Sequence, residues 1–318
     1  MRFDDQVAVI TGAGNGLGKE YALLLASRGA RVLVNDIGGS VTGTGSDADT
    51  ATAAADEIRR RGGEAIADNT SVTSPEGGQA IIDAAVQAWG RVDIVINNAG
   101  IVRDAPFEDV SADRLDPLVD VHLRGAFYVT RPAWKIMREQ RYGRILNTCS
   151  AAGLLGAERM SNYGAAKTGL VGLTRVLAAE GADRNIKVNA VAPIAYTRML
   201  AHSVESAGQP DDPSAQAVLD DLVTQYLQKL DPALVAPVAA FLTHRDCPVS
   251  GEIYTVGAGH VARLFIGRTQ GFYDPALTVE QVREHLDEIR DEAGYTVPTG
   301  PADEMAALFA TIMAGQPG

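Results

Sequence analysis

The sequence predicts an α/β fold in which a doubly wound parallel sheet is followed by a C-terminal helical extension. Short runs rich in β-branched residues alternate with longer amphipathic segments, and these runs are apolar almost throughout. Such strands are typical of a parallel sheet covered by helices on both faces. The alternation stops near residue 260 of the 318 residues, which marks the end of the predicted core.

The predicted strands occur at the spacing of strand–helix–strand units. They cover residues 7–10, 31–34, 92–96, 144–147, 186–189 and 252–256. We therefore expect residues 1–260 to form one core domain and residues 261–318 to form an extension that packs on the core or on a partner copy. A stretch at 207–213, rich in Gly, Pro and Asp, predicts an inserted loop of the kind that often forms a mobile lid.

The extension carries its own helix signals. Thr278 and Gln281 have the spacing of a capping box, which predicts a helix that continues to about Asp291. A second short helix is predicted from Ala302 to Met313.

Composition and charge exclude several classes of protein. Hydrophobic residues make up 46% of the chain and charged residues 21%, which is enough apolar material for a large core. The formal net charge of −12 opposes binding to phosphate backbones and to anionic lipid, so we expect no nucleic-acid partner and no membrane association. No apolar run is long enough to span a bilayer, and no metal site is predicted.

The cellular compartment is predicted from cysteine use and from the chain ends. Only two cysteines occur, Cys149 and Cys247, which argues against a disulfide framework and favours a reducing compartment. The first residues show no export signal, and Gly315–Gly318 is not a peroxisomal address. We therefore expect a cytoplasmic protein.

A glycine-rich turn follows the first predicted strand and precedes a helix-like segment. It reads Thr11-Gly12-Ala13-Gly14-Asn15-Gly16-Leu17-Gly18. Glycines let a backbone turn tightly and approach phosphates, whose charge is stabilised by the free N–H groups of a helix N-terminus. The pattern predicts a dinucleotide site formed by Gly12, Asn15, Gly16, Leu17 and Gly18. An ordinary glycine-rich turn is the alternative.

Asp36 closes the second predicted strand, 18 residues after Gly18. A carboxylate at this position accepts hydrogen bonds from the adenosine ribose hydroxyls and repels a 2′-phosphate. We therefore predict NAD as the cofactor in preference to NADP. The alternative is a solvated carboxylate at a strand end.

Tyr163 and Lys167 stand four residues apart on a segment with helical spacing, so both side chains leave one face of a helix. A tyrosine that acts as a base near neutral pH needs a nearby cation to favour the phenolate, and Lys167 is expected to supply it. Ser150 ends the predicted fifth strand, where open α/β sheets bind ligands, and its hydroxyl could hold a substrate oxygen. The alternatives are a surface Tyr–Lys pair and a serine helix cap.

These motifs together resemble the short-chain dehydrogenase/reductase family over roughly residues 5 to 260. The resemblance adds Asn97-Asn98-Ala99-Gly100 after the fourth strand, and it implies a Rossmann-type sheet with the nicotinamide beside Ser150 and Tyr163. It also implies that Lys167 hydrogen-bonds the nicotinamide ribose. Further cofactor contacts are expected from Ser71, Val72, Asn98, Ala99, Gly100 and Ile194.

Four longer stretches narrow the resemblance to one branch of the family. They are residues 35–39, 59–63, 121–125 and 142–145, and they look like the dehydrogenase unit of the peroxisomal multifunctional enzyme type 2. That unit is similar to 17β-hydroxysteroid dehydrogenases, and the resemblance implies NAD-dependent oxidation of a small-molecule substrate, (3R)-hydroxyacyl-CoA, to 3-ketoacyl-CoA. The tail resembles the extension of the same branch, which implies a homodimer.

The chain departs from the common family pattern at three positions. His122 stands where most members have an asparagine that holds a proton-relay water, and we expect it to be compatible with catalysis. Pro193-Ile194 replaces a Pro-Gly pair, and Thr70 replaces an acid beside the adenine.

Several alternatives stay open from the sequence. The substrate could be a steroid in place of an acyl-CoA thioester, and a non-catalytic NAD-binding sensor or scaffold is the alternative of another class. The pocket-side candidates Leu154, Leu155 and Tyr196 fit either substrate, and Arg103 and Arg124 are candidates for CoA only because they are cationic. Three glycines, which could let two copies of one helix approach or could permit packing on the sheet, are Gly164, Gly169 and Gly172.

Overall fold

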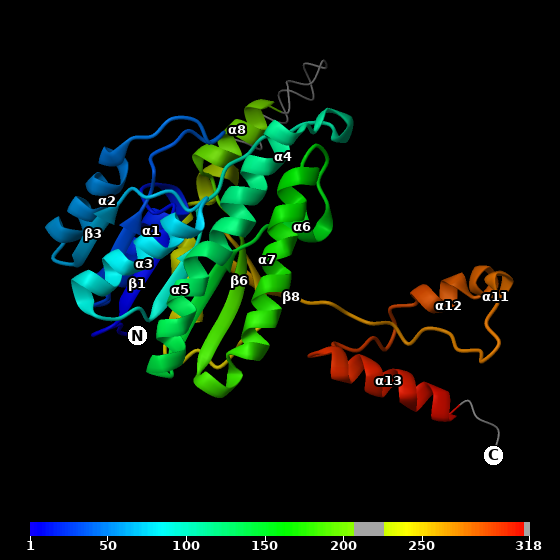
Figure 1. The fold of residues 1–318 in the computed structure, drawn as a ribbon. Coiled ribbons are helices and arrows are strands. Elements are labelled where there is room, and N and C mark those ends of the chain that lie inside the picture. The colour runs from blue at the N-terminus through cyan, green and yellow to red at the C-terminus, as the bar shows by residue number, and fades with distance from the viewer. Residues whose placement is uncertain (207–225, 315–318) are drawn as a thin grey trace. The chain divides into compact units, whose positions relative to one another are not determined.

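The computed structural model describes residues 1–206 and 226–314, so the insertion predicted at 207–213 lies outside the described residues (Figure 1). The chain divides into two compact units, Met1–Arg263 and Leu264–Gly318. The first unit contains the sheet and the helices that cover it.

The sheet has eight strands in the order β3-β2-β1-β4-β5-β6-β7-β8. Their bounds are β1 Val7–Thr11, β2 Arg31–Asn35, β3 Glu64–Asp68, β4 Ile94–Asn97, β5 Gly143–Thr148, β6 Ile186–Ile194, β7 Ile253–Gly257 and β8 His260–Leu264. Neighbours from β3 to β7 pair in parallel, with Val9 opposite Leu33 on one side and Val95 on the other. The predicted doubly wound α/β fold is therefore confirmed.

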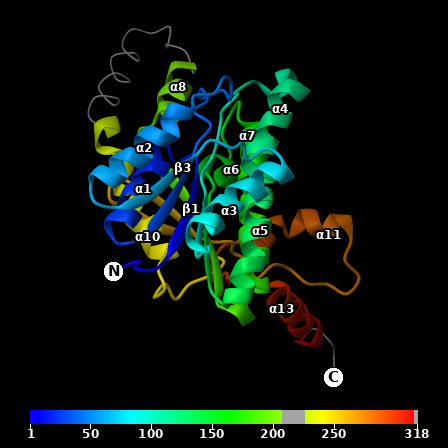
Figure 2. The same ribbon diagram turned by 60° about the vertical axis from the view of Figure 1, so that its left-hand side comes forward.

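The helices of the first unit lie on both faces of this sheet (Figures 1 and 2). The α-helices are α1 Gly16–Ser27, α2 Ala48–Arg60, α3 Pro75–Trp89, α4 Ala112–Leu118, α5 Gly125–Gln140, α6 Ala151–Leu155, α7 Ser161–Glu180, α8 Arg198–Ser206 and α10 Ala236–Thr243. The shorter turns are η1 Phe107–Asp109, the π-helix η2 Val119–Arg124, η3 Ala182–Arg184, η4 Leu227–Lys229 and η5 Pro232–Leu234.

The two faces of the sheet contact different helices because successive side chains of a strand point in opposite directions. On β1, Ala8 and Ile10 belong to a core cluster with residues of α1, α2 and α10. Val7 and Val9 belong to a second cluster with residues of α3 and α5. All four side chains are fully buried, which explains why this strand is apolar throughout.

Two strands, β3 and β8, lie outside the ranges predicted above. β3 is a short strand with only Ala65 buried, so its sequence lacks a continuous apolar run. β8 follows β7 after only Ala258 and Gly259, whose φ angles of +49° and +79° suit a tight hairpin turn. The chain therefore reverses where the alternating pattern was expected to end.

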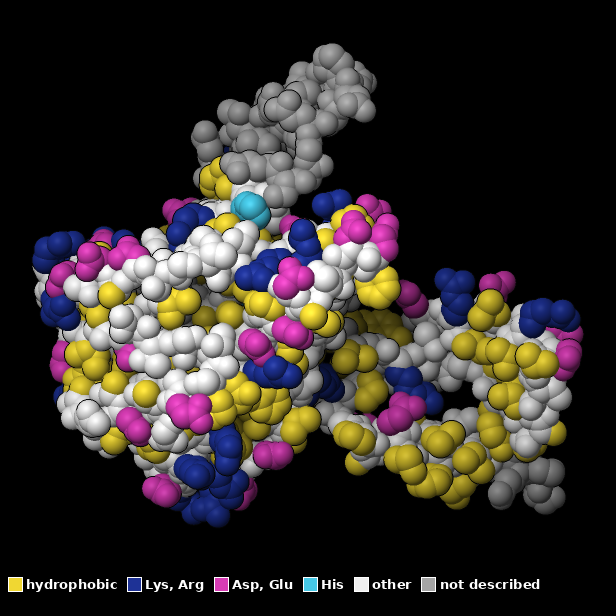
Figure 3. All heavy atoms as spheres, turned by 45° about the horizontal axis from the view of Figure 1, so that its top comes forward, with side chains coloured by type: hydrophobic (Ala, Val, Ile, Leu, Met, Phe, Trp, Pro, Cys, Tyr) yellow, Lys and Arg dark blue, Asp and Glu magenta, His cyan; other side chains and the backbone are white. Residues whose placement is uncertain are grey.

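The second unit contains α11 Val279–Glu284, α12 Leu286–Arg290 and α13 Pro301–Ala314. The capping box of Thr278 and Gln281 is present, but the helix predicted from it forms two short helices that meet at His285. Many hydrophobic side chains of this unit are exposed, Val279 at 77% and Met313 at 75%, and Figure 3 shows them gathered over much of its surface. Within residues 1–206 and 226–314, no helix combines the length and apolar character that crossing a bilayer requires.

Candidate active site

The glycine turn connects β1 to α1 in a conformation that requires its glycines. Gly12 has a φ of +62°, and a Cβ there would lie 2.8 Å from the Ala99 Cα. A Cβ at Gly18 would lie 2.3 Å from the Gly12 carbonyl oxygen. At Gly16, by contrast, the nearest side-chain atom would be 3.6 Å away, on Thr197. The turn thus packs tightly at three of its four glycines and leaves Gly16 open to a ligand.

The start of α1 provides hydrogen-bond donors to this opening. Asn15 is the N-cap residue, but its side chain makes no capping hydrogen bond. The first N–H groups of a helix, here those of Gly16, Leu17 and Gly18, have no partner within the helix. They form the kind of anion site that a pyrophosphate occupies.

The segment after β4 is fastened to the glycine turn. The Thr11 hydroxyl accepts hydrogen bonds from the backbone N–H groups of Asn98 and Ala99, both at 3.1 Å. The Asn98 amide donates to the carbonyl oxygens of Thr11 and Gly12 at 3.1 and 3.0 Å. A Cβ at Gly100 would lie 2.5 Å from the His122 ring, so a glycine is needed there as well.

Asp36 lies directly after β2, beside the glycine turn. Its two carboxylate oxygens accept hydrogen bonds from the backbone N–H groups of Gly14, at 2.9 Å, and Gly38, at 2.8 Å. A carboxylate accepts about four hydrogen bonds, so capacity remains for ribose hydroxyls. The loop after β3 is tied to this edge because the Asn35 amide donates to the Thr70 carbonyl at 2.8 Å. Ser71 and Val72 follow in that loop, and Val72 is buried.

Ser150, Tyr163 and Lys167 come together at the carboxyl end of β5. Ser150 caps α6, and its hydroxyl accepts a hydrogen bond from the Ala152 N–H at 3.2 Å. Tyr163 and Lys167 lie one turn apart on α7, 8% and 3% exposed, with the Lys167 Nζ 5.6 Å from the centre of the Tyr163 ring. The Lys167 ammonium donates to the Thr148 carbonyl at 2.7 Å. The two side chains therefore share one side of α7, as the spacing predicted.

The electrostatics of the pair differ from the expectation. Burial raises the pKa of Tyr163 to about 12, and the hydrogen bond with Ser150 opposes this shift. Burial also lowers the pKa of Lys167 to about 8. Burial of the phenol is the largest cause of its shift, and Lys167 is not among the groups that lower the pKa of Tyr163. With its pKa at about 12, the Tyr163 phenol is therefore neutral near pH 7.

His122 lies on the π-helix η2 beneath this pair. Its ring is 2% exposed and meets the Tyr163 ring edge-on, with 5.2 Å between the ring centres. Burial and the charge of Lys167 hold the pKa of His122 well below its usual value, so the ring is neutral. Its Nε2 lies 2.8 Å from the Ile101 carbonyl oxygen and also accepts from the Ile101 N–H at 3.1 Å, so these contacts do not select one tautomer. The buried Nδ1 has no hydrogen-bond partner among the described residues.

The other predicted site residues lie at the same edge. Ile194 ends β6 and is 47% exposed, while Leu155 of α6 and Tyr196 are 75% and 45% exposed. These side chains offer apolar surface beside the carboxyl ends of β5 and β6.

Asn162 is a site residue that the sequence reasoning missed. It is buried directly before Tyr163, and its amide donates to the carbonyl oxygens of Arg103 at 3.1 Å and Arg114 at 3.0 Å. It therefore anchors the start of α7 to the segment after β4 and to α4. The only signal for it in the sequence was its polar side chain directly before a tyrosine that is buried.

Comparisons with known proteins agree with this geometry. A family model described as short chain dehydrogenase matches residues 6–207. The peroxisomal multifunctional enzyme type 2 of Mus musculus is 42% identical over 303 residues, which cover 94% of this chain and 38% of that protein. The putative short-chain type dehydrogenase/reductase Rv0148 of Mycobacterium tuberculosis is 43% identical over 294 residues, 92% of this chain and 96% of that protein.

A solved structure extends the similarity to the fold. The full-length peroxisomal multifunctional enzyme type 2 of Drosophila melanogaster superposes with a TM-score of 0.78 and 33% identity, over 99% of this chain and 50% of that chain. The chain thus spans half or less of the length of the mouse and Drosophila proteins. Family model, relatives and fold lead to one conclusion: the chain belongs to the short-chain dehydrogenase/reductase enzymes.

Proposed function

We propose that this enzyme oxidises (3R)-hydroxyacyl-CoA to 3-ketoacyl-CoA with NAD, in the β-oxidation of fatty acids or of sterol side chains. The observation that carries the proposal is the grouping of Ser150, Tyr163 and Lys167 beside the glycine turn. The similarity to peroxisomal multifunctional enzymes supports the thioester substrate.

The residues at the carboxyl edge fit a nicotinamide dinucleotide. The open backbone at Gly16 and the N-terminus of α1 would hold the pyrophosphate, and Asp36 would hold the adenosine ribose. Ser71, Val72, Ala99, Gly100 and Ile194 would complete the site. The negative charge of Asp36 supports NAD over NADP, because a 2′-phosphate beside it would be repelled. Lower KM for NADP than for NAD would contradict this assignment.

Each catalytic side chain has a proposed role. Ser150 holds the substrate oxygen, Tyr163 removes the hydroxyl proton, and Lys167 bonds the nicotinamide ribose. When bound, the oxidised dinucleotide supplies the hydride acceptor and a positively charged ring. That charge supports phenolate formation at Tyr163, which Lys167 alone does not achieve. His122 is proposed to hydrogen-bond a proton-relay water through Nδ1.

The deciding experiment follows NADH absorbance with (3R)- and (3S)-hydroxyacyl-CoA of several chain lengths and with 17β-hydroxysteroids. We expect turnover of the (3R)-thioesters and little of the (3S)-thioesters or steroids. Preference for the steroids would move the function to hydroxysteroid oxidation. Binding of NAD without turnover of any alcohol would favour the sensor or scaffold.

Tyr163→Phe is the matched variant because it removes only the hydroxyl. We expect kcat to fall at least about a thousandfold, with NAD affinity and the melting temperature nearly unchanged. Turnover close to that of the wild type would exclude Tyr163 as the base.

The assembly and the compartment are also proposals. We propose residues 1–260 as the dinucleotide-binding catalytic domain and residues 261–318 as an extension that contributes to a homodimer, which the exposed apolar side chains of α11 and α13 support. A monomer by light scattering would contradict the dimer. Two buried free cysteines support a reducing compartment such as the cytoplasm, and cell fractionation would distinguish it from the peroxisome for which the relatives are named.

A further inference from the structure

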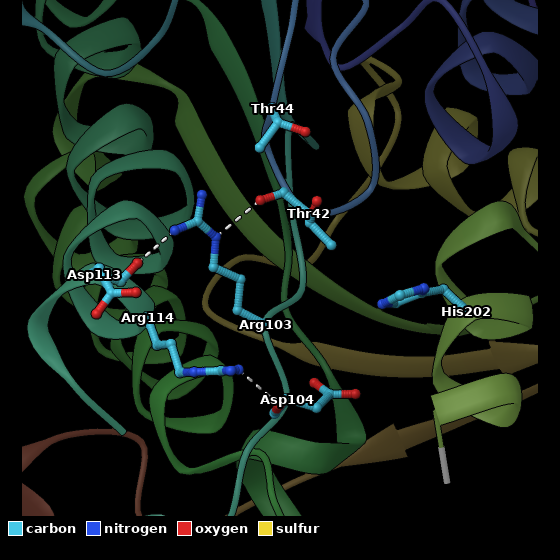
Figure 4. A pocket seen from close by; sticks show the side chains of 7 residues that line it. All are labelled: Thr42, Thr44, Arg103, Asp104, Asp113, Arg114 and His202. Carbon is cyan, nitrogen blue, oxygen red and sulfur yellow. Dashed lines mark hydrogen bonds between the residues drawn. The ribbon is translucent and has the colours of Figure 1, made fainter. Parts of the chain in front are cut away.

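A polar pocket of about 350 Å³ lies at the carboxyl edge of the sheet. Its volume falls within the range of small-molecule sites. Four segments distant in the sequence form it: the loop after β2 with Thr42, the residues after β4 with Arg103, α4 with Arg114, and α8 with His202 (Figure 4). The mechanism proposed above uses none of these side chains.

The pocket is connected to the candidate active site through Asn162. Its amide holds the backbone carbonyls of both Arg103 and Arg114, and the next residue is Tyr163. Asp104, which also lines the pocket, is one of the charges that raise the pKa of Tyr163. The pocket therefore lies within electrostatic reach of the phenol.

The two arginines are held by backbone carbonyls. Arg103 donates to the Thr42 carbonyl at 2.8 Å and to the Asp113 carbonyl, and Arg114 donates to the Asp104 carbonyl at 3.3 Å (Figure 4). Among the residues that the structure describes, neither forms an ion pair. Each guanidinium has five N–H groups, so donors remain for an anion.

The acidic side chains of the pocket leave donors of the two arginines available for an anion. The Asp113 carboxylate accepts from the Ser111 hydroxyl, and both arginines contribute to its lowered pKa, so the lining is of mixed charge. Asp104 accepts from the Ser203 hydroxyl at 3.3 Å through one oxygen. Its other oxygen is buried and has no hydrogen-bond partner within the described part of the chain. Among residues 1–206 and 226–314, the oxygen that bonds Ser203 accepts only this one hydrogen bond, so it keeps capacity for a ligand N–H or O–H.

We infer that this pocket binds the carrier portion of the thioester substrate, with phosphate groups on Arg103 and Arg114 and an amide or hydroxyl donor on Asp104. CoA has both kinds of group, since it carries phosphates as well as amide N–H and hydroxyl groups. A steroid nucleus has no group for the arginines. The inference rests on the proposed function and assigns the part of the substrate that does not react.

The test compares two thioesters of one (3R)-3-hydroxyacyl group under saturating NAD. One is the CoA thioester, and the other is the pantetheine thioester, which lacks the nucleotide and its phosphates. Arg103→Gln and Arg114→Gln are the test variants, because each keeps polarity and removes the charge. Arg124→Gln is the matched control, since Arg124 already pairs with Asp120 at 2.6 Å and does not line the pocket.

We expect each test variant to raise KM for the CoA thioester about tenfold, with kcat within about twofold, because a charge-assisted contact is lost. KM for the pantetheine thioester should stay unchanged in every variant, and Arg124→Gln should match the wild type. The melting temperature and the NAD affinity of each variant show whether it is correctly folded. If Arg103→Gln does not fold, Arg114→Gln alone carries the test, because it removes only one long hydrogen bond.

Equal effects on both thioesters, or no effect on either, would overturn the inference. If the wild type oxidises neither thioester, the proposed function fails, and binding of free CoA in the presence of NADH then decides the pocket. Weaker CoA binding to Arg103→Gln would support the pocket, and absence of CoA binding to the wild type would reject it.

Discussion

Arg144 at the amino edge of the parallel sheet and His122 and Asp104 at its carboxyl edge differ in how their buried polar atoms are partnered. At the amino edge, where β5 begins, the Arg144 side chain is 1% exposed and makes five hydrogen bonds to oxygen atoms of neighbouring residues. At the carboxyl edge, His122 and Asp104 each keep a buried polar atom with no partner among the described residues. Because Gln6 Oε1 at the amino edge is also buried without a partner, a missing partner does not by itself mark a chemical role, and His122 stands out because it also contacts Tyr163.

Arg144→Met should have the greatest effect on stability. The guanidinium is itself buried and holds the carbonyl oxygens of Gly143, Asn185, His244 and Arg245, of which those of Asn185 and His244 also accept from a backbone N–H. We expect the free energy of unfolding to fall by more than about 3 kcal/mol, measured by urea denaturation.

The control for this variant is Arg131→Met, at an exposed position of α5, which should change stability by less than about 0.5 kcal/mol. The kcat of folded Arg144→Met protein should equal that of the wild type. A selective loss of kcat with normal stability would mean that the amino edge takes part in the chemistry.

Lys167 should make stability depend on pH. Burial lowers its pKa from 10.5 to about 8, so between these values the unfolded chain binds more protons than the folded one. Stability therefore rises with pH across this window, by at most on the order of 3 kcal/mol. Lys167→Met should lack the rise, which unfolding measurements at about pH 8 and about pH 10 would detect. If the stability of the wild type and of Lys167→Met depended on pH in the same way, burial of the Lys167 ammonium would not lower the free energy of unfolding.

The carboxyl edge could be predicted from the sequence where backbone geometry dictates the residue. Gly12 and Gly18 have no room for a Cβ, so their pattern is visible in the sequence without a structure. Apolar strands such as β1 were equally clear, because both faces of the sheet are covered. β3 was missed because a partly exposed edge strand does not need a continuous apolar run.

The pocket of Arg103 and Arg114 could not be predicted in this way. Four segments distant in the sequence form it, and no spacing connects them. The sequence offered Arg103 and Arg124 as equal candidates, and only the structure separates a pocket-lining arginine from one that pairs with Asp120. The pKa directions of Tyr163 and Lys167 were not visible in the sequence for a related reason, because spacing gives proximity but not burial.

His122 tests the carboxyl edge through its unpartnered nitrogen. His122→Phe preserves the buried ring and removes Nδ1, so we expect kcat to fall about tenfold with KM for NAD unchanged. His122→Asn restores a polar group that can bond the Ile101 carbonyl, and it should recover most of the activity. Stopped-flow measurement of NADH formation would compare the three proteins. Equal kcat in the Phe and Asn variants would make His122 a purely structural residue.

Gly172 should show the smallest effect, at a position that belongs to neither edge. Outside its own helix, a Cβ there meets no atom of the described residues within 4 Å, whereas a Cβ at Gly169 would lie 3.0 Å from Leu123. Gly169 is therefore explained by packing within the chain. A Cβ at Gly164 would lie 3.5 Å from the Ala152 carbonyl oxygen, so Gly172 is the most open of the three glycines for the approach of a second copy. If α7 pairs with a partner there, Gly172→Leu should raise the dimer dissociation constant about tenfold, measured by analytical ultracentrifugation, and Gly172→Ala should raise it less. If α7 faces water, Gly172→Ala should instead raise the free energy of unfolding by about 0.5–1 kcal/mol, because alanine is the better helix former. The assembly should then stay unchanged, and the dimer contact would have to come from the extension.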